Sequence, residues 1–256
     1  GGNTIEVHRV QRLGRAYKFV AYDQVNCGRS TCTVEPAAWD FPTFIEQYFS
    51  VLAHFHRSSA SVIGHSWGGF LAIELALRHP AAIDKLVISS AAPSGQLFID
   101  GAYELMLQMP EVDVEIMQRC EAEQDYDNPE YQAATHRYYE RHLCRTLPWP
   151  ADVVESSDRL NVEMYRHLWG PSEFTATGML KTWDATPHLP RITHPTLLIS
   201  GEHDEAQPIA QQPMLDGIPN ASWTLLPDSA HLTYVDATEG FLAAVEGFLG
   251  VSTAAE

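Results

Sequence analysis

The hydrophobic residues of this chain fall into short continuous runs and into longer runs with helical spacing. Short apolar runs, which are typical of buried strands, occupy residues 17–22, 61–63, 84–90, 195–200 and 222–226. Runs with apolar side chains three or four positions apart, which are typical of helices, cover residues 41–55, 70–78 and 241–249. Strands and helices thus alternate before residue 95 and again after residue 194. This alternation predicts a mostly parallel sheet covered by helices.

A different pattern lies between these two halves. From about Gly95 to Trp183 no run predicts a strand, and helix-like runs extend over residues 102–109, 112–123, 129–143 and 151–169. Most charges of an acidic stretch from Glu111 to Glu130 are interpreted as a solvated helix face. We therefore predict an α/β core of residues 1–94 and 184–256 with an inserted helical cap of residues 95–183. Residues 251–256 are expected to fray.

Composition narrows the classes of partner. A chain of 256 residues can bury a sizeable core, and its formal net charge of −17 disfavours nucleic acid and anionic membranes. No apolar run approaches the roughly 20 residues that span a membrane. A small molecule or short peptide is the expected partner, and a cytoplasmic location is expected.

Cysteines and histidines give no sign of a metal centre. The four cysteines have no C-x-x-C spacing and are expected to be reduced thiols: Cys27, Cys32, Cys120 and Cys144. Of the 12 histidines, the closest pair is His54 and His56, and no set of further ligands accompanies it. We therefore predict no metal and no cofactor.

The strongest chemical signal is the segment Gly64–Gly68, which reads G-x-S-x-G around Ser66. It follows a predicted strand and precedes a predicted helix, which is the setting of a nucleophile elbow. The tight turn exposes the serine hydroxyl, and side chains at Gly64 or Gly68 are expected to clash. The following helix is expected to aim backbone N–H groups, Trp67 first, at developing negative charge.

A serine hydroxyl needs a base, usually a histidine that a carboxylate orients. Asp204 and His231 each follow a predicted strand, in the order serine, acid, histidine. Carboxyl ends of parallel strands meet at one edge of a sheet, where ligand sites form. We predict that Ser66 is the nucleophile, His231 the general base and Asp204 its orienting acid. Alternatives remain, as acids Glu202, Glu205 and Asp228, and as bases His65 and His203.

These features resemble the α/β-hydrolase superfamily over nearly the whole chain, and three segments resemble the proline iminopeptidase family more narrowly. Tyr22–Ser30 resembles the family's Y-D-Q-x-G-C-G-R-S segment, except that Asn26 stands where glycine is usual. Trp169–Phe174 resembles its cap motif, and Gly201–Ala206 its acid loop. The resemblance implies a serine hydrolase that acts by acyl transfer and releases N-terminal residues, with proline favoured, from small peptides or amides.

The resemblance also implies roles for further residues. Glu173 and Glu205 would bind the free amino group of the substrate, and the Trp67 N–H would be one donor of the oxyanion hole. The family's H-G-G-P-G loop, which supplies another donor, has no counterpart after Gly1. We therefore expect early strands of the sheet and a second oxyanion donor to be missing.

Other functions remain open at this point. One is a carboxylesterase or lactonase that acts on small esters. Another is a ligand-binding homologue with low turnover, or an inactive truncated product. Dehalogenases and epoxide hydrolases are disfavoured because they place aspartate where this chain has Ser66.

Overall fold

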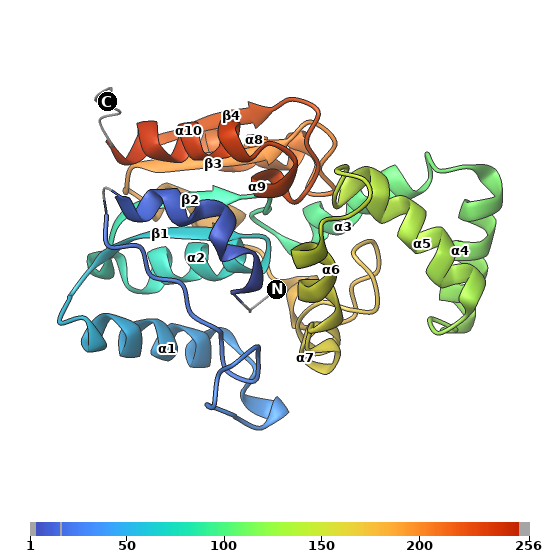
Figure 1. Ribbon diagram of the computed structural model, residues 1–256, viewed down its shortest axis with the longest axis horizontal. Helices are drawn as coiled ribbons and strands as arrows, with labels where there is room; N and C mark the ends of the chain where they lie inside the picture. Colours follow the sequence, from blue (N-terminus) through green and yellow to red (C-terminus); the bar gives the residue numbers. More distant parts are fainter. Residues whose placement is uncertain (1–3, 16, 251–256) are drawn as a thin grey trace.

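The computed structural model describes residues 4–15 and 17–250 and has a four-stranded parallel sheet at its centre (Figure 1). The strands lie side by side in sequence order, and their bounds are β1 (Ala60–His65), β2 (Ile83–Ser89), β3 (Thr196–Gly201) and β4 (Ala221–Leu226). Four of the five predicted strands and the predicted α/β class are thereby confirmed. The tail of residues 251–256 and the first residues Gly1 and Gly2 lie outside the described residues.

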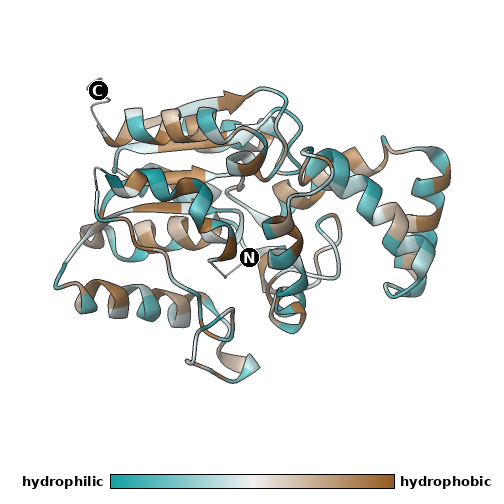
Figure 2. Ribbon diagram, in the orientation of Figure 1, coloured by the Kyte–Doolittle hydropathy of each residue, from teal (hydrophilic) through white to brown (hydrophobic). Residues whose placement is uncertain are grey.

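Helices cover both faces of the sheet because successive apolar side chains along its strands point to opposite faces. On β2, Val87 points to one face and packs with Phe241 and Leu13, whereas Leu86 and Ile88 belong to the cluster on the other face. The first face is covered by α10 (Thr238–Leu249) and η1 (Ile5–Arg15), and the second by α1 (Phe41–His54), α2 (Trp67–Arg78) and α8 (Pro208–Gly217). In Figure 2, α1 and α10 alternate between hydrophilic and hydrophobic residues, as amphipathic helices do.

Between β2 and β3 the chain forms a helical segment, residues 95–183. An antiparallel bridge from Ser94 to Asp184 joins its two ends. Its α-helices are α3 (Gly95–Met106), α4 (Glu111–Glu123), α5 (Pro129–His142), α6 (Ala151–Asp158) and α7 (Val162–Leu168). Helices α4 and α5 pair with each other and project away from the sheet (Figure 1). The remaining helical turns are η2 (Pro36–Ala38), η3 (Pro80–Ala82), η4 (Met179–Thr182), η5 (Thr186–Arg191) and α9 (Thr233–Asp236).

One interpretation of the helical segment needs correction. The single helix predicted over residues 151–169 is wrong, because the Asn161 side chain accepts the N–H of Met164 and begins α7 as a separate helix. Within the acidic stretch, Asp113 is an exception to the solvated charges, since it is buried and accepts a 3.0 Å hydrogen bond from Nε of Arg137. That ion pair links α4 to α5.

The strand predicted over residues 17–22 is also wrong. These residues form no regular element, and Tyr17 and Val20 are exposed. A strand needs a neighbour, and β1 pairs with β2 on one side only; none of the described residues forms a strand at its other edge. The apolar side chains of residues 17–22 instead line a cavity beside Val62 and Ile63 of β1.

None of the helices in residues 4–15 and 17–250 is both long enough and apolar enough to cross a membrane.

Candidate active site

Ser66 occupies a strained turn between β1 and α2. Its backbone has φ 53° and ψ −120°, a conformation that residues with a side chain rarely adopt. The strain is held from both sides: the Ser66 N–H donates to the Ser89 carbonyl at 2.9 Å, and the Ser66 carbonyl accepts from Gly69 N–H at 2.7 Å. Helix α2 begins at Trp67, so its first N–H groups lie beside the serine. The turn therefore presents Ser66 in the manner of a nucleophile elbow.

Of Gly64 and Gly68, only Gly64 is required because a side chain would clash. A Cβ at Gly64 would lie 2.2 Å from the Gly68 carbonyl oxygen, so a side chain there is excluded. A Cβ at Gly68 would meet no atom within 4 Å among the described residues, and the expectation of a clash there is wrong. The close approach is made by the Gly68 backbone itself. The second crowded position is Gly69, whose Cβ would lie 2.5 Å from Cβ of Ala91.

Asp204 and His231 meet at the carboxyl ends of β3 and β4. Oδ1 of Asp204 lies 2.8 Å from Nδ1 of His231, and the same oxygen accepts the N–H of Ala206 at 2.8 Å. Both side chains are almost completely buried. Because the carboxylate accepts, Nδ1 carries the proton and Nε2 of the neutral ring is left as the basic atom.

A cavity of about 970 Å³ is lined by several of the predicted site residues, although Asp204 and Glu205 are not among its lining residues. Ser66, Trp67, His231 and Glu173 all line it. Its walls near His231 are aromatic: the ring of Phe98 lies 6.0 Å from the His231 ring and 4.8 Å from Trp169, edge to face in both cases. The arrangement offers a hydroxyl, an oriented imidazole and an apolar chamber to one bound molecule.

Glu205 is a buried carboxyl group that forms no hydrogen bond with the described residues. Its side chain is 0% exposed, and neither carboxylate oxygen has a hydrogen-bond partner among the described residues. Burial raises its pKa well above the usual range, and the nearby carboxylates of Glu173 and Asp204 raise it further. Glu173 is half-buried and accepts a 2.7 Å hydrogen bond from the Tyr165 hydroxyl. The two carboxyl groups are thus near enough for the charge of Glu173 to act on Glu205.

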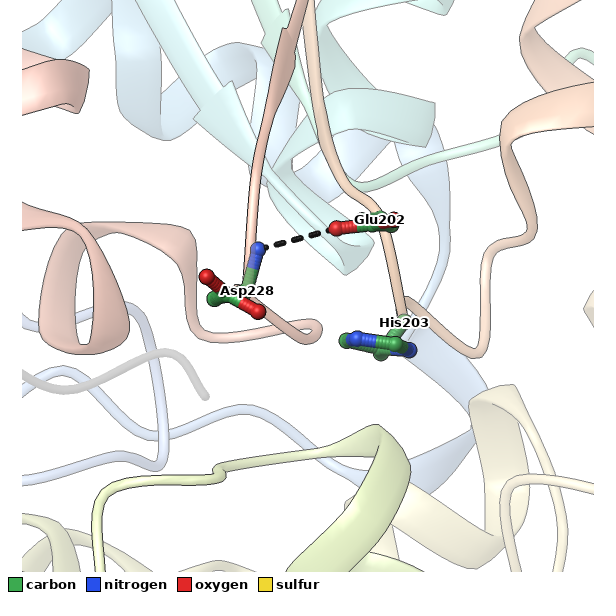
Figure 3. A group of neighbouring side chains, drawn as sticks. All are labelled: Glu202, His203 and Asp228. Atoms are coloured by element: carbon green, nitrogen blue, oxygen red, sulfur yellow. Dashed lines mark hydrogen bonds between the residues drawn. The ribbon is translucent and has the colours of Figure 1, made fainter.

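The other candidate acids lie apart from this site. Glu202 and Asp228 are exposed and lie beside His203, with Oε2 of Glu202 accepting the N–H of Asp228 at 3.1 Å (Figure 3). Within the described chain these three form the one group whose ligand atoms, all within 4.8 Å of one another, could share a metal ion. None of these three described residues lines the cavity of Ser66. The exposure of Glu202 and Asp228 fits solvated side chains, whereas Asp204 and His231 are buried.

The remaining candidate base, His65, lies beside His231. Their ring centroids are 4.9 Å apart, and the Tyr234 ring closes the other side of His65 at 5.0 Å. Burial lowers the pKa of His65 well below its usual value, and the neighbouring His231 lowers it further. His65 is therefore a neutral ring that packs against His231, and no carboxylate orients it among the described contacts.

Asn26, the departure from the family pattern, suits its position. Its φ of 56° lies in the left-handed region, which favours glycine and admits asparagine. Its side-chain oxygen accepts the N–H of Val34 at 3.0 Å, a contact that glycine lacks. Nearby, Gln24 accepts a 3.1 Å hydrogen bond from the Trp67 indole, so this segment contacts the turn of Ser66.

Some residues around the site carried no sequence signal. Tyr165 holds Glu173 from α7, the Ser90 hydroxyl donates to the His231 carbonyl at 2.9 Å, and His142 contacts both loops of the site from the end of α5. Each of them reaches the site only through the tertiary arrangement. No local motif could have identified them.

The comparisons with known proteins place this geometry in a family. The sequence model of the alpha/beta hydrolase fold matches residues 8–238. The chain belongs to the α/β-hydrolase family. A curated proline iminopeptidase of Levilactobacillus brevis is 31% identical over 232 residues, which are 90% of this chain and 78% of the relative.

Two solved structures agree with that relationship. A proline iminopeptidase from Mycobacterium smegmatis shares 32% identity at a TM-score of 0.88, and the match covers 98% of this chain and 86% of the other. The protein VinJ shares 29% identity at a TM-score of 0.91 with the same two coverages. The predicted resemblance to proline iminopeptidases is confirmed, and a hydrolase function is supported.

Proposed function

We propose that this α/β-hydrolase is a serine hydrolase that releases N-terminal residues, with proline favoured, from small peptides or amides. Ser66 attacks the carbonyl carbon of the N-terminal residue while His231 accepts the hydroxyl proton through Nε2. Asp204 keeps the His231 ring in the required tautomer and stabilises its charged form. The Trp67 N–H, first in α2, donates to the oxygen that becomes negative.

The attack forms a tetrahedral intermediate, and two further steps complete the reaction. His231 returns the proton to the leaving amine, which departs and leaves an acyl ester on Ser66. Water, deprotonated by His231, attacks this ester and frees the N-terminal residue. No cofactor takes part in these steps.

The observation that carries the aminopeptidase proposal is the unpaired, buried carboxyl group of Glu205 beside Glu173. A substrate ammonium between them would supply the missing hydrogen-bond donors and offset one negative charge. The aromatic walls formed by Phe98 and Trp169 suit an apolar ring such as that of proline. We further propose that the helical segment of residues 95–183 acts as a cap, since it contributes Glu173 and these walls.

The test compares two substrates in Glu173→Gln. Removing one partner of a buried charge pair costs about 3–5 kcal/mol, so kcat/KM for L-prolyl-p-nitroanilide should fall at least about 100-fold. p-Nitrophenyl acetate has no amino group, and its hydrolysis should change less than about twofold on this reasoning. The matched control is Glu163→Gln on α7, which alters an exposed carboxylate and should leave both rates unchanged.

Two outcomes would contradict the proposal. If both substrates lose activity equally, Glu173 supports the structure rather than the amino group, and a carboxylesterase or lactonase becomes the better interpretation. If neither loses activity, the amino group is not recognised by this pair.

A further inference from the structure

One residue at the end of helix α5 is hydrogen-bonded to both loops that hold the acid and the base. Nδ1 of His142 lies 3.0 Å from the carbonyl oxygen of His203, the residue immediately before Asp204. The carbonyl oxygen of His142 accepts the N–H of His231 at 3.1 Å. The next residue continues the contact, because the Leu143 carbonyl accepts the N–H of Leu232 at 2.8 Å.

The chemistry of the His142 contact is defined by its partner. A carbonyl oxygen only accepts, so Nδ1 of His142 must carry a proton and donate. Burial lowers the pKa of His142, which favours the neutral ring that donates through this one nitrogen. His142 is half-buried and is not among the residues that line the cavity of Ser66. Its role must therefore be exerted through its neighbours.

A second contact ties the same stretch of chain to the histidine loop. The carboxylate of Asp236 accepts the N–H of Thr146 at 2.9 Å through Oδ1 and the N–H of Ala230 at 3.0 Å through Oδ2. The two loops also contact each other directly, since the His203 N–H donates to the Ser229 carbonyl at 2.9 Å. Loss of the His142 side chain would consequently leave the loops attached, but would release the acid loop from α5.

We propose that His142 is a positioning residue, which sets the separation of Asp204 and His231 from the end of helix α5. This inference rests on the proposed function of that pair. The Nδ1–H of His142 fixes the backbone before the acid, and its carbonyl fixes the backbone of the base, so one residue spans the 2.8 Å contact on which the base depends. Misplacement of a catalytic group by about 1 Å can reduce a rate on the order of 100-fold.

The test uses three substitutions that differ in where they place a donor. In His142→Asn the amide nitrogen occupies the place of Nδ1, in His142→Gln it lies one bond further out, and in His142→Ala it is absent. With L-prolyl-p-nitroanilide, Ala and Gln should lower kcat about 10- to 100-fold with KM within about twofold, because alignment rather than binding is lost. Asn should restore kcat to within about threefold on the same reasoning. His188→Ala, an exposed histidine on η5, is the control that should change nothing.

A second measurement monitors the hydrogen bond between His231 and Asp204 without substrate turnover. The proton between Nδ1 of His231 and Asp204 should give a low-field NMR signal, which disappears in His231→Gln. His142→Ala and His142→Gln should broaden it by faster exchange with water, and His142→Asn should preserve it. This reading tests the positioning role even if Ser66 proves not to be a nucleophile, so failure of the proposed function can be distinguished from failure of this inference.

Three results would overturn the inference. One is an unchanged kcat and an unchanged NMR signal in both Ala and Gln variants. Another is an Asn variant that loses as much as the Ala variant, which would mean that the donor at Nδ1 is not what matters. The third is a change in KM alone, which would place His142 in binding. If His142→Ala does not fold, the comparison of His142→Asn with His142→Gln still tests whether a donor at the place of Nδ1 is needed.

Discussion

Oε1 of Glu205 lies 3.8 Å from Nδ1 of His231, whereas Oδ1 of Asp204 lies 2.8 Å from the same nitrogen. Two carboxyl groups that are adjacent in sequence thus have different environments. Asp204 accepts hydrogen bonds from the His231 imidazole and from a backbone N–H. Neither oxygen of Glu205 has a hydrogen-bond partner among the described residues. In the proposed mechanism, Asp204 orients the base and Glu205 is available to a cation of the substrate.

The first prediction concerns stability. The pKa of Glu205 is raised in the folded protein above its usual 4.5, so its contribution to stability is present below that pH and is lost as the pH rises through the folded pKa. Glu205→Gln should therefore raise the melting temperature at pH 8 by about 2 °C or more, the shift expected for ~1 kcal/mol in a chain of this size. The gain should shrink as the pH is lowered towards 4.5.

Calorimetry across this pH range checks the prediction, with Glu202→Gln as the control because Glu202 is an exposed glutamate of the same loop. A melting temperature that falls in Glu205→Gln at pH 8 would show that the carboxylate has a stabilising partner. The same variant should lose activity on free-amino substrates, which would show that the buried charge is kept for function at the expense of stability.

The second prediction distinguishes the orienting acid from its alternatives. Asp204→Asn should hold His231 in the wrong tautomer and reduce kcat by roughly three to four orders of magnitude. Asp228→Asn alters an exposed acid on the loop of His231 and should leave kcat within about twofold, as surface changes away from a site usually do. Steady-state kinetics with one substrate is sufficient. A larger loss in Asp228→Asn than in Asp204→Asn would reverse the assignment.

The third prediction concerns the nucleophile. Ser66→Ala should abolish covalent labelling of the chain by a fluorophosphonate probe, because the probe reacts with an activated serine hydroxyl. Ser50→Ala removes an exposed hydroxyl that bonds to the Glu46 carbonyl of its own helix, and labelling should persist. Mass spectrometry of the labelled peptide identifies the site. Modification at a serine other than Ser66 would be incompatible with the proposed mechanism.

The fourth prediction tests the construction of the turn. In Gly64→Ala the new methyl group would lie 2.2 Å from the Gly68 carbonyl oxygen, so the turn must open and the protein should lose at least about 1–3 kcal/mol of stability. In Gly68→Ala the methyl group enters open space, and the melting temperature should stay the same. Equal losses in the two variants would show that the two glycines share one steric role.

Much of the fold could be predicted because it depends on local patterns. The parallel strands were visible as short apolar runs, and Asp204 and His231 could be assigned because each follows such a run. Parallel strands bring their carboxyl ends to one edge of the sheet, so residues that directly follow two neighbouring strands lie close together.

Other features depended on neighbours that a sequence pattern does not reveal. Residues 17–22 have the composition of a strand but no strand beside them among the described residues. The role of His142 depends on where helix α5 ends relative to two distant loops, and the crowding at Gly69 comes from the side chain of Ala91. These are properties of packing, and they became visible only in three dimensions.

The most direct test of the account compares L-prolyl-p-nitroanilide with its N-acetylated form. Acetylation removes the positive charge that Glu173 and Glu205 are proposed to bind and leaves the scissile amide unchanged. The account predicts a kcat/KM at least about 100-fold higher for the free amine, the ratio expected when a buried carboxylate loses its partner, and complete loss of this hydrolysis in Ser66→Ala. Equal or faster hydrolysis of the acetylated substrate by the same chain would contradict it.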